Sequence, residues 1–220
     1  MNLHIENINL TSNSGPNSFA NKLIKYITKS SVEVDFTKKP DAHLCFIESN
    51  KVEFKKPMFL RLDGIYFNVD FDYRSQNSNI KRTYELADGV VFQSEFNKQL
   101  TFKYFGNHNN YTIIHNGADY EMINQTPELK FDRYENLWCC ASSWRPHKRL
   151  GENIRYFLEH SEGNDGLMIA GKVSKEDRVI HDRVHYVGHL NQRQLFSLYK
   201  KSKFLIHLAW LDHCPNVVVD

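Results

Sequence analysis

Short apolar segments alternate with stretches of helical periodicity along most of this 220-residue chain, and this alternation constrains the fold more than any single motif. Strand and helix in alternation are typical of a parallel sheet, because each parallel strand needs a crossover connection. The sequence therefore predicts an α/β fold. The expected strands are 5–10, 42–47, 58–62, 89–93, 111–115, 137–141, 166–170, 184–187 and 204–208. The expected helices are 18–29, the second half of 69–87, 94–104, 148–160 and 191–201.

Residues 116–135 interrupt this alternation and predict a linker. The segment contains Gly117, Pro127 and scattered charges, with no sustained periodicity. A chain of 220 residues allows one large domain or two small ones. We therefore expect residues 1–120 to form one parallel-sheet domain and residues 121–220 to form a second.

The net charge and the first residues of the chain indicate which binding partners and which cellular location to expect. A formal net charge of +2 is too small to make a nucleic acid or an anionic membrane the expected main partner. The opening MNLHIENINL lacks a basic region followed by an apolar run, and no apolar stretch is long enough to span a membrane. We expect a cytoplasmic protein with no transmembrane segment, for which peripheral membrane contact remains open. The cysteines, expected as reduced core thiols without metal-ligand spacing, are Cys45, Cys139, Cys140 and Cys214.

The last stretch, FLIHLAWLDHCPNVVVD, predicts a binding site for an anion. Pro215 suits the first position of a helix, where its missing N–H would have no partner. A helix start near Cys214–Val217 would present free N–H groups and a partial positive charge. Asp212 and Asp220 flank this start as hydrogen-bond acceptors. The spacing suits a phosphate between two hydroxyl-rich rings, as in a nucleotide sugar.

The segment CCASSWRPHKRL predicts a second part of the same site. A strand, a short basic loop and a helix place the loop at the carboxyl edge of a sheet, where open α/β folds bind ligands. Arg145 and Lys148 are close enough in sequence to bind one diphosphate. A solvated basic helix start explains RPHKR equally well. Because positive charges at a helix N-terminus oppose the helix dipole, a bound anion would relieve a local conflict.

Eight segments, spread over almost the whole chain, carry a resemblance to a known family. They are SGPNSFANKL (14–23), RLDGIYFN (61–68), ADGVVFQSEFNKQLTFKYFG (87–106), YTIIHNGAD (111–119), SSWRPHKRL (142–150), MIAGK (168–172), VHYVGHLNQRQLFSLYKKSKFLIH (184–207) and DHCPNVVVD (212–220). In content and order they resemble the retaining glycosyltransferases of family four. The resemblance implies the GT-B architecture, two Rossmann-like parallel-sheet domains facing a cleft. The family usually has Glu at both ends of the last segment, where this chain has Asp212 and Asp220.

This resemblance implies transfer of a sugar from a nucleotide-diphosphate sugar to an acceptor hydroxyl, with the anomeric configuration retained. The nucleotide sugar is a co-substrate, and no metal or other cofactor is expected. The acceptor would be a glycan, a lipid-linked sugar or a small molecule. Arg145 and Lys148 would stabilise charge on the leaving diphosphate. Asp212 would hold the transferred sugar and Asp220 the donor ribose, and the leaving phosphate oxygen would take the acceptor proton.

Position within the family adds further site residues. Those expected on the donor side are Ser14, Gly15, Lys172, His213, Cys214, Pro215, Asn216, Val217 and Asp220. Arg61 and Asp63, at the end of an expected strand, are assigned to the acceptor side. Plainer interpretations remain open: a turn for Ser14–Gly15, a solvated side chain for Lys172, and a surface salt bridge for Arg61 and Asp63.

Two other functions are compatible with the sequence. A sugar-nucleotide epimerase of the same architecture would act without an acceptor, and a product assay with the donor alone would distinguish it. A catalytically silent nucleotide-sugar-binding protein is the second alternative. A family member would continue beyond Asp220, so the second domain is expected to be incomplete and the chain, as a fragment, could lack activity.

Overall fold

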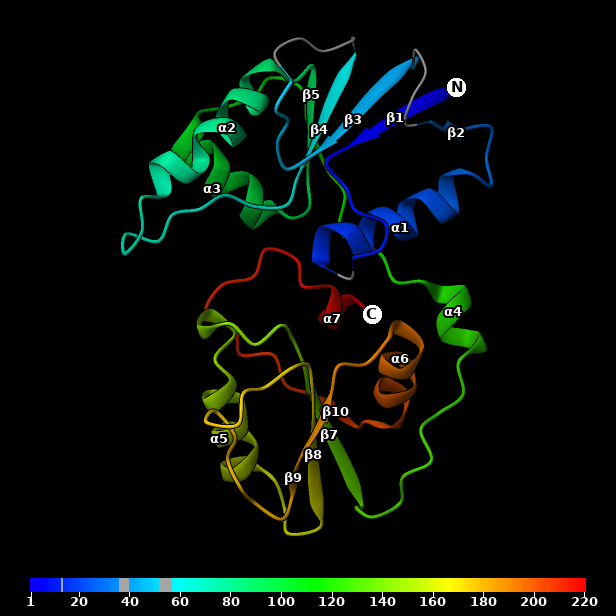
Figure 1. The fold of residues 1–220 in the computed structure, drawn as a ribbon, viewed down its shortest axis with the longest axis vertical. Coiled ribbons are helices and arrows are strands. Elements are labelled where there is room, and N and C mark those ends of the chain that lie inside the picture. Colours follow the sequence, from blue (N-terminus) through cyan, green and yellow to red (C-terminus); the bar gives the residue numbers. More distant parts are fainter. Residues whose placement is uncertain (13, 36–39, 52–56) are drawn as a thin grey trace. The chain divides into compact units, whose positions relative to one another are not determined.

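The computed structural model describes residues 1–12, 14–35, 40–51 and 57–220. Their contacts divide them into two compact units, each built on a parallel sheet flanked by helices (Figure 1). Unit 1 comprises Met1–Gly117 with His213–Asn216, and unit 2 comprises Ala118–Asp212 with Val217–Asp220. Residues 213–216 were predicted to belong to the second domain, whereas their contacts group them with unit 1.

Unit 1 contains a six-stranded sheet in the order β2-β1-β3-β4-β5-β6, with every described strand pair parallel. Its strands are β1 (Asn2–Glu6), β2 (Glu33–Val34), β3 (Ala42–Phe46), β4 (Met58–Leu62), β5 (Gly89–Phe92) and β6 (Tyr111–Ile113). Its helices are α1 (Gly15–Ile27), α2 (Tyr73–Leu86) and α3 (Glu95–Phe105).

Apolar side chains cover both faces of the sheet in unit 1 and form two separate layers. On one face, Leu60 and Leu62 of β4 pack with Ile80 and Tyr84 of α2. On the other face, α1 packs against residues of β1 and β3 such as Phe46. Because successive side chains of a strand point to opposite faces, the residue between Leu60 and Leu62 is directed toward the α1 side. That residue is Arg61.

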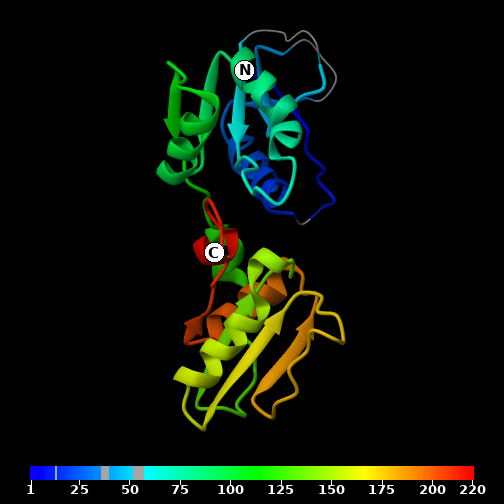
Figure 2. The same ribbon diagram turned by 90° about the vertical axis from the view of Figure 1, so that its left-hand side faces the viewer.

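Unit 2 contains a four-stranded parallel sheet in the order β10-β7-β8-β9. Its strands are β7 (Asn136–Ala141), β8 (Asp165–Ala170), β9 (Val184–Gly188) and β10 (Phe204–Leu205). The helices are α4 (Tyr120–Gln125), the 3-10 turn η1 (Pro146–Lys148), α5 (Leu150–His160), α6 (Gln192–Lys201) and, except for its first residue, α7 (Asn216–Val219). Helices α5 and α6 lie on opposite sides of this sheet, and Figure 2 shows β8 (yellow) and β9 (orange) running in parallel beside α5.

The core of unit 2 explains its apolar strands. All residues of β8 are buried, as expected for a parallel strand covered on both faces. Cys140 of β7 packs with Ile154 and Phe157 of α5, while Cys139 packs with Leu198 of α6. Burial raises the pKa of the Cys139 thiol to about 11, so this group stays protonated at neutral pH. All four cysteines are free thiols; Cys45, Cys139 and Cys140 are buried as the sequence predicted, whereas Cys214 is only partly buried.

Local side-chain chemistry fixes several helix starts. Ser94 accepts a hydrogen bond from the backbone N–H of Asn97 at 3.1 Å and caps α3. Asn191 and Gln194 form a reciprocal capping box at the start of α6. Asp119 caps α4, so the segment expected as a linker contains a short helix. Its acidic cap was the missed signal.

Other expected boundaries were wrong by a few residues. Strand β1 ends at Glu6 because Asn7 takes a positive φ of 61°, and the chain leaves the sheet there. Helix α1 begins at Gly15 because Pro16 fits its first turn. The expected strand 204–208 shortens to β10, and the short strand β2 was not expected. Among the residues described, no helix is both long and apolar enough to cross a membrane.

Truncation of Phe157 tests the α5 layer. Phe157 is fully buried, so Phe157→Ala should destabilise unit 2 by about 3–5 kcal/mol through lost burial and a residual cavity. The neighbouring Tyr156 is 41% exposed, and Tyr156→Ala should cost less than about 1 kcal/mol. Urea unfolding followed by tryptophan fluorescence reports on unit 2, because that unit holds all three tryptophans of the chain. Equal losses in both variants would contradict the assignment of this core.

Candidate functional site

The loops after β7 and β8 in unit 2 meet at the carboxyl edge of its sheet. The last residues of the two strands, Ala141 and Ala170, are paired in register. The indole Nε1 of Trp144 donates to the carbonyl of Ala170 at 2.9 Å, so the first loop folds back on the second strand. Gly171 has a positive φ of 112°, and a side chain there would collide with the carbonyl of Ser142 and the Trp144 ring. The edge is therefore closely packed where ligands of open α/β folds bind.

Lys148, Asp212 and His207 form a charged cluster at this edge. The Lys148 ammonium donates to Oδ2 of Asp212, and His207 Nε2 lies 3.0 Å from the same oxygen. The side chains of Lys148, Asp212 and His207 are only 18%, 25% and 16% exposed. Burial alone would raise the pKa of Asp212, but hydrogen bonds from His207 and Lys148 bring that pKa below its ordinary value. Asp212 is therefore an ionised acceptor at neutral pH.

Asn153 of α5 holds this cluster in place. Its amide donates to the carbonyls of Lys148 at 3.1 Å and Arg149 at 2.8 Å, and accepts from the backbone N–H of Leu208 at 3.0 Å. Asn153 is 1% exposed. One side chain thus joins the basic loop to the segment after β10. A polar residue on the apolar face of a predicted helix was the available sequence signal, and neither Asn153 nor His207 was predicted.

The other expected residues of this edge are solvent-facing. Arg145 precedes η1 and Lys172 follows Gly171, and both are exposed. His147 lies between Arg145 and Lys148 and is held by a hydrogen bond from the backbone N–H of Trp210 to its carbonyl at 2.7 Å. Burial and these two neighbouring cations lower the pKa of His147, so its ring is neutral at pH 7.

Arg61 and Asp63 form a second polar group, within unit 1. The Arg61 side chain is 2% exposed, donates from Nη2 to Asn116 Oδ1 at 2.5 Å, and lies over the Phe19 ring with 4.4 Å to its centroid. Asp63 Oδ1 is 4.0 Å from Arg61 Nη2. Within the described residues, Arg61 Nε and Nη1 and Asp63 Oδ1 are buried without a hydrogen-bond partner. The pair is therefore no surface salt bridge, which was the plainer interpretation of the sequence.

Burial sets the protonation of this pair. It raises the pKa of Asp63 to about 6, although the charge of Arg61 acts in the opposite direction. Burial also lowers the pKa of Arg61, with Asp63 opposing the change. Asp63 therefore exchanges a proton close to neutral pH, in contrast to Asp212.

The segment 213–216 lies beside this polar group in unit 1. Asn116 donates from Nδ2 to the carbonyl of Cys214 at 2.8 Å, and Asn216 donates to the carbonyl of Gly15 at 3.1 Å. The His213 ring lies 5.5 Å from that of Phe96, centroid to centroid. Several residues expected on the donor side are thus brought together in unit 1.

The remaining expected residues of the last segment have other surroundings. Helix α7 begins at Asn216, so Pro215 precedes it instead of occupying its first position, and the helix has only four residues. Ser14 caps α1 without a side-chain hydrogen bond. Val217 packs with apolar residues of unit 2 such as Leu198. The helix that the sequence predicted at the end of the chain is therefore present, but it begins one residue after Pro215.

Solved structures of other proteins share the fold of this chain. No protein-family model matches the chain, and no curated protein matches it by sequence. HepE of Anabaena, solved in complex with UDP and glucose, is similar with a TM-score of 0.67 and 14% identity, over 99% of this chain and 77% of HepE. The lipopolysaccharide outer core galactosyltransferase WaaB gives 0.65 and 14%, over 100% of this chain and 77% of WaaB. The fold is GT-B.

Other solved GT-B-like structures extend this set. TarM is similar with a TM-score of 0.54 and 16% identity, and the chain spans 37% of its length. A candidate UDP-N-acetylglucosamine 2-epimerase from Listeria monocytogenes gives a TM-score of 0.55 and 12% identity, over 93% of this chain and 73% of that protein. The structural similarity establishes the GT-B fold. At identities this low it does not establish the reaction.

The pKa values of Asp63 and Asp212 should be shifted in opposite directions from that of an ordinary aspartate. Asp63 should show a midpoint near pH 6, while Asp212 should titrate below the ordinary aspartate range. Since unfolded aspartate has a pKa of about 3.9, the folded state retains the Asp63 proton between pH ~4 and ~6 while the unfolded chain releases it. Asp63 therefore lowers the free energy of unfolding as pH rises through that window. Asp212 acts in the opposite sense: it stabilises the folded state above its unfolded pKa, and this stabilisation is lost as pH falls through its lowered folded pKa.

Carboxyl-carbon NMR titration measures both midpoints, with Asp63→Asn and Asp212→Asn identifying the signals. The contribution of Asp63 to the pH dependence of unfolding should disappear in Asp63→Asn. A midpoint for Asp63 at or below pH 4 would show that the side chain is hydrated, contrary to its burial.

Proposed function

We propose that this chain is a retaining glycosyltransferase of family four that takes its sugar from a nucleotide-diphosphate donor. The observation that carries the proposal is the Lys148–Asp212 pair, supported by Asn153, at the carboxyl edge of the second sheet. The GT-B fold supports the same conclusion, since HepE has that fold and was solved with UDP and glucose. A UDP-sugar is accordingly the first donor to test.

In the proposed mechanism, positive side chains stabilise charge that develops on the leaving diphosphate. A lysine ammonium has three donors, and Lys148 uses one on Asp212, so it keeps others for phosphate oxygens. Arg145 adds a second, exposed cation on the same loop. Lys172, on the neighbouring loop, provides a third. This arrangement requires no metal ion and no cofactor beyond the donor.

The two aspartates of the last segment have separate proposed roles. Asp212 is ionised and partly buried, which suits acceptance of hydrogen bonds from hydroxyls of the transferred sugar. Asp220 would accept from the donor ribose. His213 to Val217, together with Ser14 and Gly15, are proposed as further donor-binding residues. The acceptor proton would pass to the leaving phosphate oxygen, so no separate protein base is needed.

Arg61 and Asp63 are proposed to bind the acceptor. Their buried N–H groups and carboxylate oxygen lack partners among the described residues, and a hydroxylated acceptor can satisfy both kinds of group. Residues 1–120 would then form the acceptor-side domain and residues 121–220 the nucleotide-sugar domain. The acceptor is proposed to be a glycan, a lipid-linked sugar or a small molecule.

An epimerase is the second candidate, favoured by the similar fold of the Listeria monocytogenes protein. Incubation with UDP-sugar alone distinguishes the two reactions. An epimerase changes the configuration of the sugar without an acceptor, whereas the proposed transferase produces a glycoside only when an acceptor hydroxyl is present.

Removal of the basic side chains should weaken UDP binding. Lys148→Ala and Arg145→Ala should each cost roughly 1.5–3 kcal/mol, about a 10- to 150-fold rise in Kd, if each makes a charged hydrogen bond to the diphosphate. Calorimetric titration with UDP measures the effect. Arg155→Ala changes an exposed cation in the middle of α5, outside the two loops, and should leave the Kd unchanged. Unaltered affinity in both loop variants would remove their diphosphate role.

The two aspartates should separate binding of UDP from binding of a UDP-sugar. Asp220→Asn should weaken both ligands, because its proposed partner is the ribose. Asp212→Asn should weaken only the UDP-sugar, because its proposed partner is the transferred sugar. An amide loses the charge-assisted hydrogen bonds of the carboxylate, so each effect should be measurable by calorimetry. The division of roles would be wrong if each substitution reduced both affinities by the same factor.

A further inference from the structure

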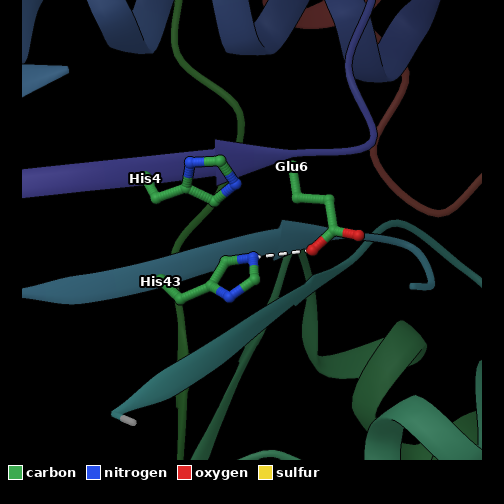
Figure 3. Close-up of side chains that lie close together, drawn as sticks. All are labelled: His4, Glu6 and His43. Carbon is green, nitrogen blue, oxygen red and sulfur yellow. Dashed lines mark ion pairs between the residues drawn. The ribbon is translucent and has the colours of Figure 1, made fainter. Parts of the chain in front are cut away.

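Two imidazoles and a carboxylate lie side by side on the sheet of unit 1, away from the groups discussed above. His4 and Glu6 belong to β1, and His43 belongs to β3 (Figure 3). His4 is paired in register with His43, so their side chains leave the same face of the sheet, and Glu6 follows two residues after His4 on that face. One potential ligand atom from each side chain lies within 4.8 Å of the others.

Hydrogen bonds outside this group orient two of its members. His4 Nδ1 lies 3.1 Å from the carbonyl of Asp35, which places the ring proton on Nδ1 and leaves the Nε2 lone pair for the cluster. Ser49 donates its hydroxyl to Glu6 Oε1 at 2.7 Å, leaving Oε2 directed to the cluster. Such outer contacts are typical of metal-ligating histidines and carboxylates, because they fix the tautomer and the orientation of the ligand.

A cation, the Lys51 ammonium, already contacts two members of the group. The Lys51 ammonium lies 3.2 Å from Glu6 Oε2 and 3.4 Å from His4 Nε2. His43 Nε2 lies 2.7 Å from the same Glu6 oxygen. The Lys51 side chain is 47% exposed, whereas Glu6 and His43 are 16% and 3% exposed, so only the lysine can readily move into solvent. The backbone of Lys51 is held separately by Arg82 and Ser49.

We propose that His4, Glu6 and His43 bind one divalent metal ion of the zinc class, in competition with the ammonium of Lys51. Two imidazole nitrogens and one carboxylate oxygen are a common ligand set for Zn²⁺. Bonds of ~2.0–2.2 Å in tetrahedral geometry place ligand atoms about 3.4 Å apart. The Glu6–His43 contact therefore opens slightly, and the longest separation closes by side-chain rotation. His43 carries its proton on Nδ1 in the bound form.

The site joins neighbouring strands and leaves one coordination position open. Because the ligands come from β1 and β3, a bound ion crosslinks two adjacent strands of unit 1. Lys51 withdraws toward solvent when the ion enters, and the positive charge beside Glu6 is replaced by a larger one. This site uses none of the residues assigned above to the nucleotide sugar or acceptor, so the two assignments can fail separately.

Zinc titration of the full chain against a colorimetric chelator tests the proposal. The chelator-treated protein should bind one equivalent of Zn²⁺ at this site. His4→Ala, Glu6→Gln and His43→Ala should each weaken that equivalent by at least about a hundredfold, since each removes a ligand rather than an outer contact. Lys51→Met should strengthen it by about tenfold or more, because the competing cation is absent while the backbone contacts of residue 51 remain.

His189→Ala is the matched control, because His189 is an exposed histidine of unit 2 and its removal should leave the Kd for Zn²⁺ unchanged. Circular dichroism establishes that each variant is folded. If His43→Ala does not fold, His4→Ala, Glu6→Gln and Lys51→Met decide the outcome. Wild-type affinity in the ligand variants, or no gain in Lys51→Met, would overturn the proposal and leave the group as an ion-paired cluster.

Discussion

Burial of parallel strands on both faces is the constraint from which the proposed chemistry of this chain follows. In unit 2, every residue of β8 is buried between the α5 and α6 layers, so polar groups can gather only where the strands end. The in-register ends of β7 and β8 bring the loops after them to one edge. Lys148 and Asp212, 64 positions apart in the chain, form an ion pair there.

The strand–helix alternation could be predicted because the spacing of apolar residues is a local property of the sequence. The folded protein buries those same residues in its two sheets and their helices. Boundaries were less predictable because they depend on single residues, such as Asn7 with its positive φ and Asp119 with its capping carboxylate. Arg145, Lys148 and Asp212 were predicted as site residues, and the structure brings Lys148 and Asp212 together. Asn153 and His207 were not identified, since their importance depends on contacts with residues far along the chain.

Two aspartates of the same intrinsic acidity have opposite environments. Both are partly withdrawn from water, but Asp212 receives hydrogen bonds from a lysine and a histidine, whereas Asp63 has an arginine at 4.0 Å and an oxygen without a hydrogen-bond partner in the described part of the chain. Burial therefore raises the pKa of Asp63 despite the nearby Arg61, whereas direct hydrogen bonds lower the pKa of Asp212 despite its burial. Sequence identifies both as candidate site residues but does not distinguish these environments.

Asn153 uses a single amide group to satisfy three backbone groups from two separate loops. An aspartate at this position would keep the acceptor and lose both donors, and a leucine of similar volume would lose all three contacts. Position 153 is therefore a point at which two loops must change together. A related chain with another residue there would need a rebuilt turn before α5 and a different exit from β10, so this one amide links the sequences of both loops.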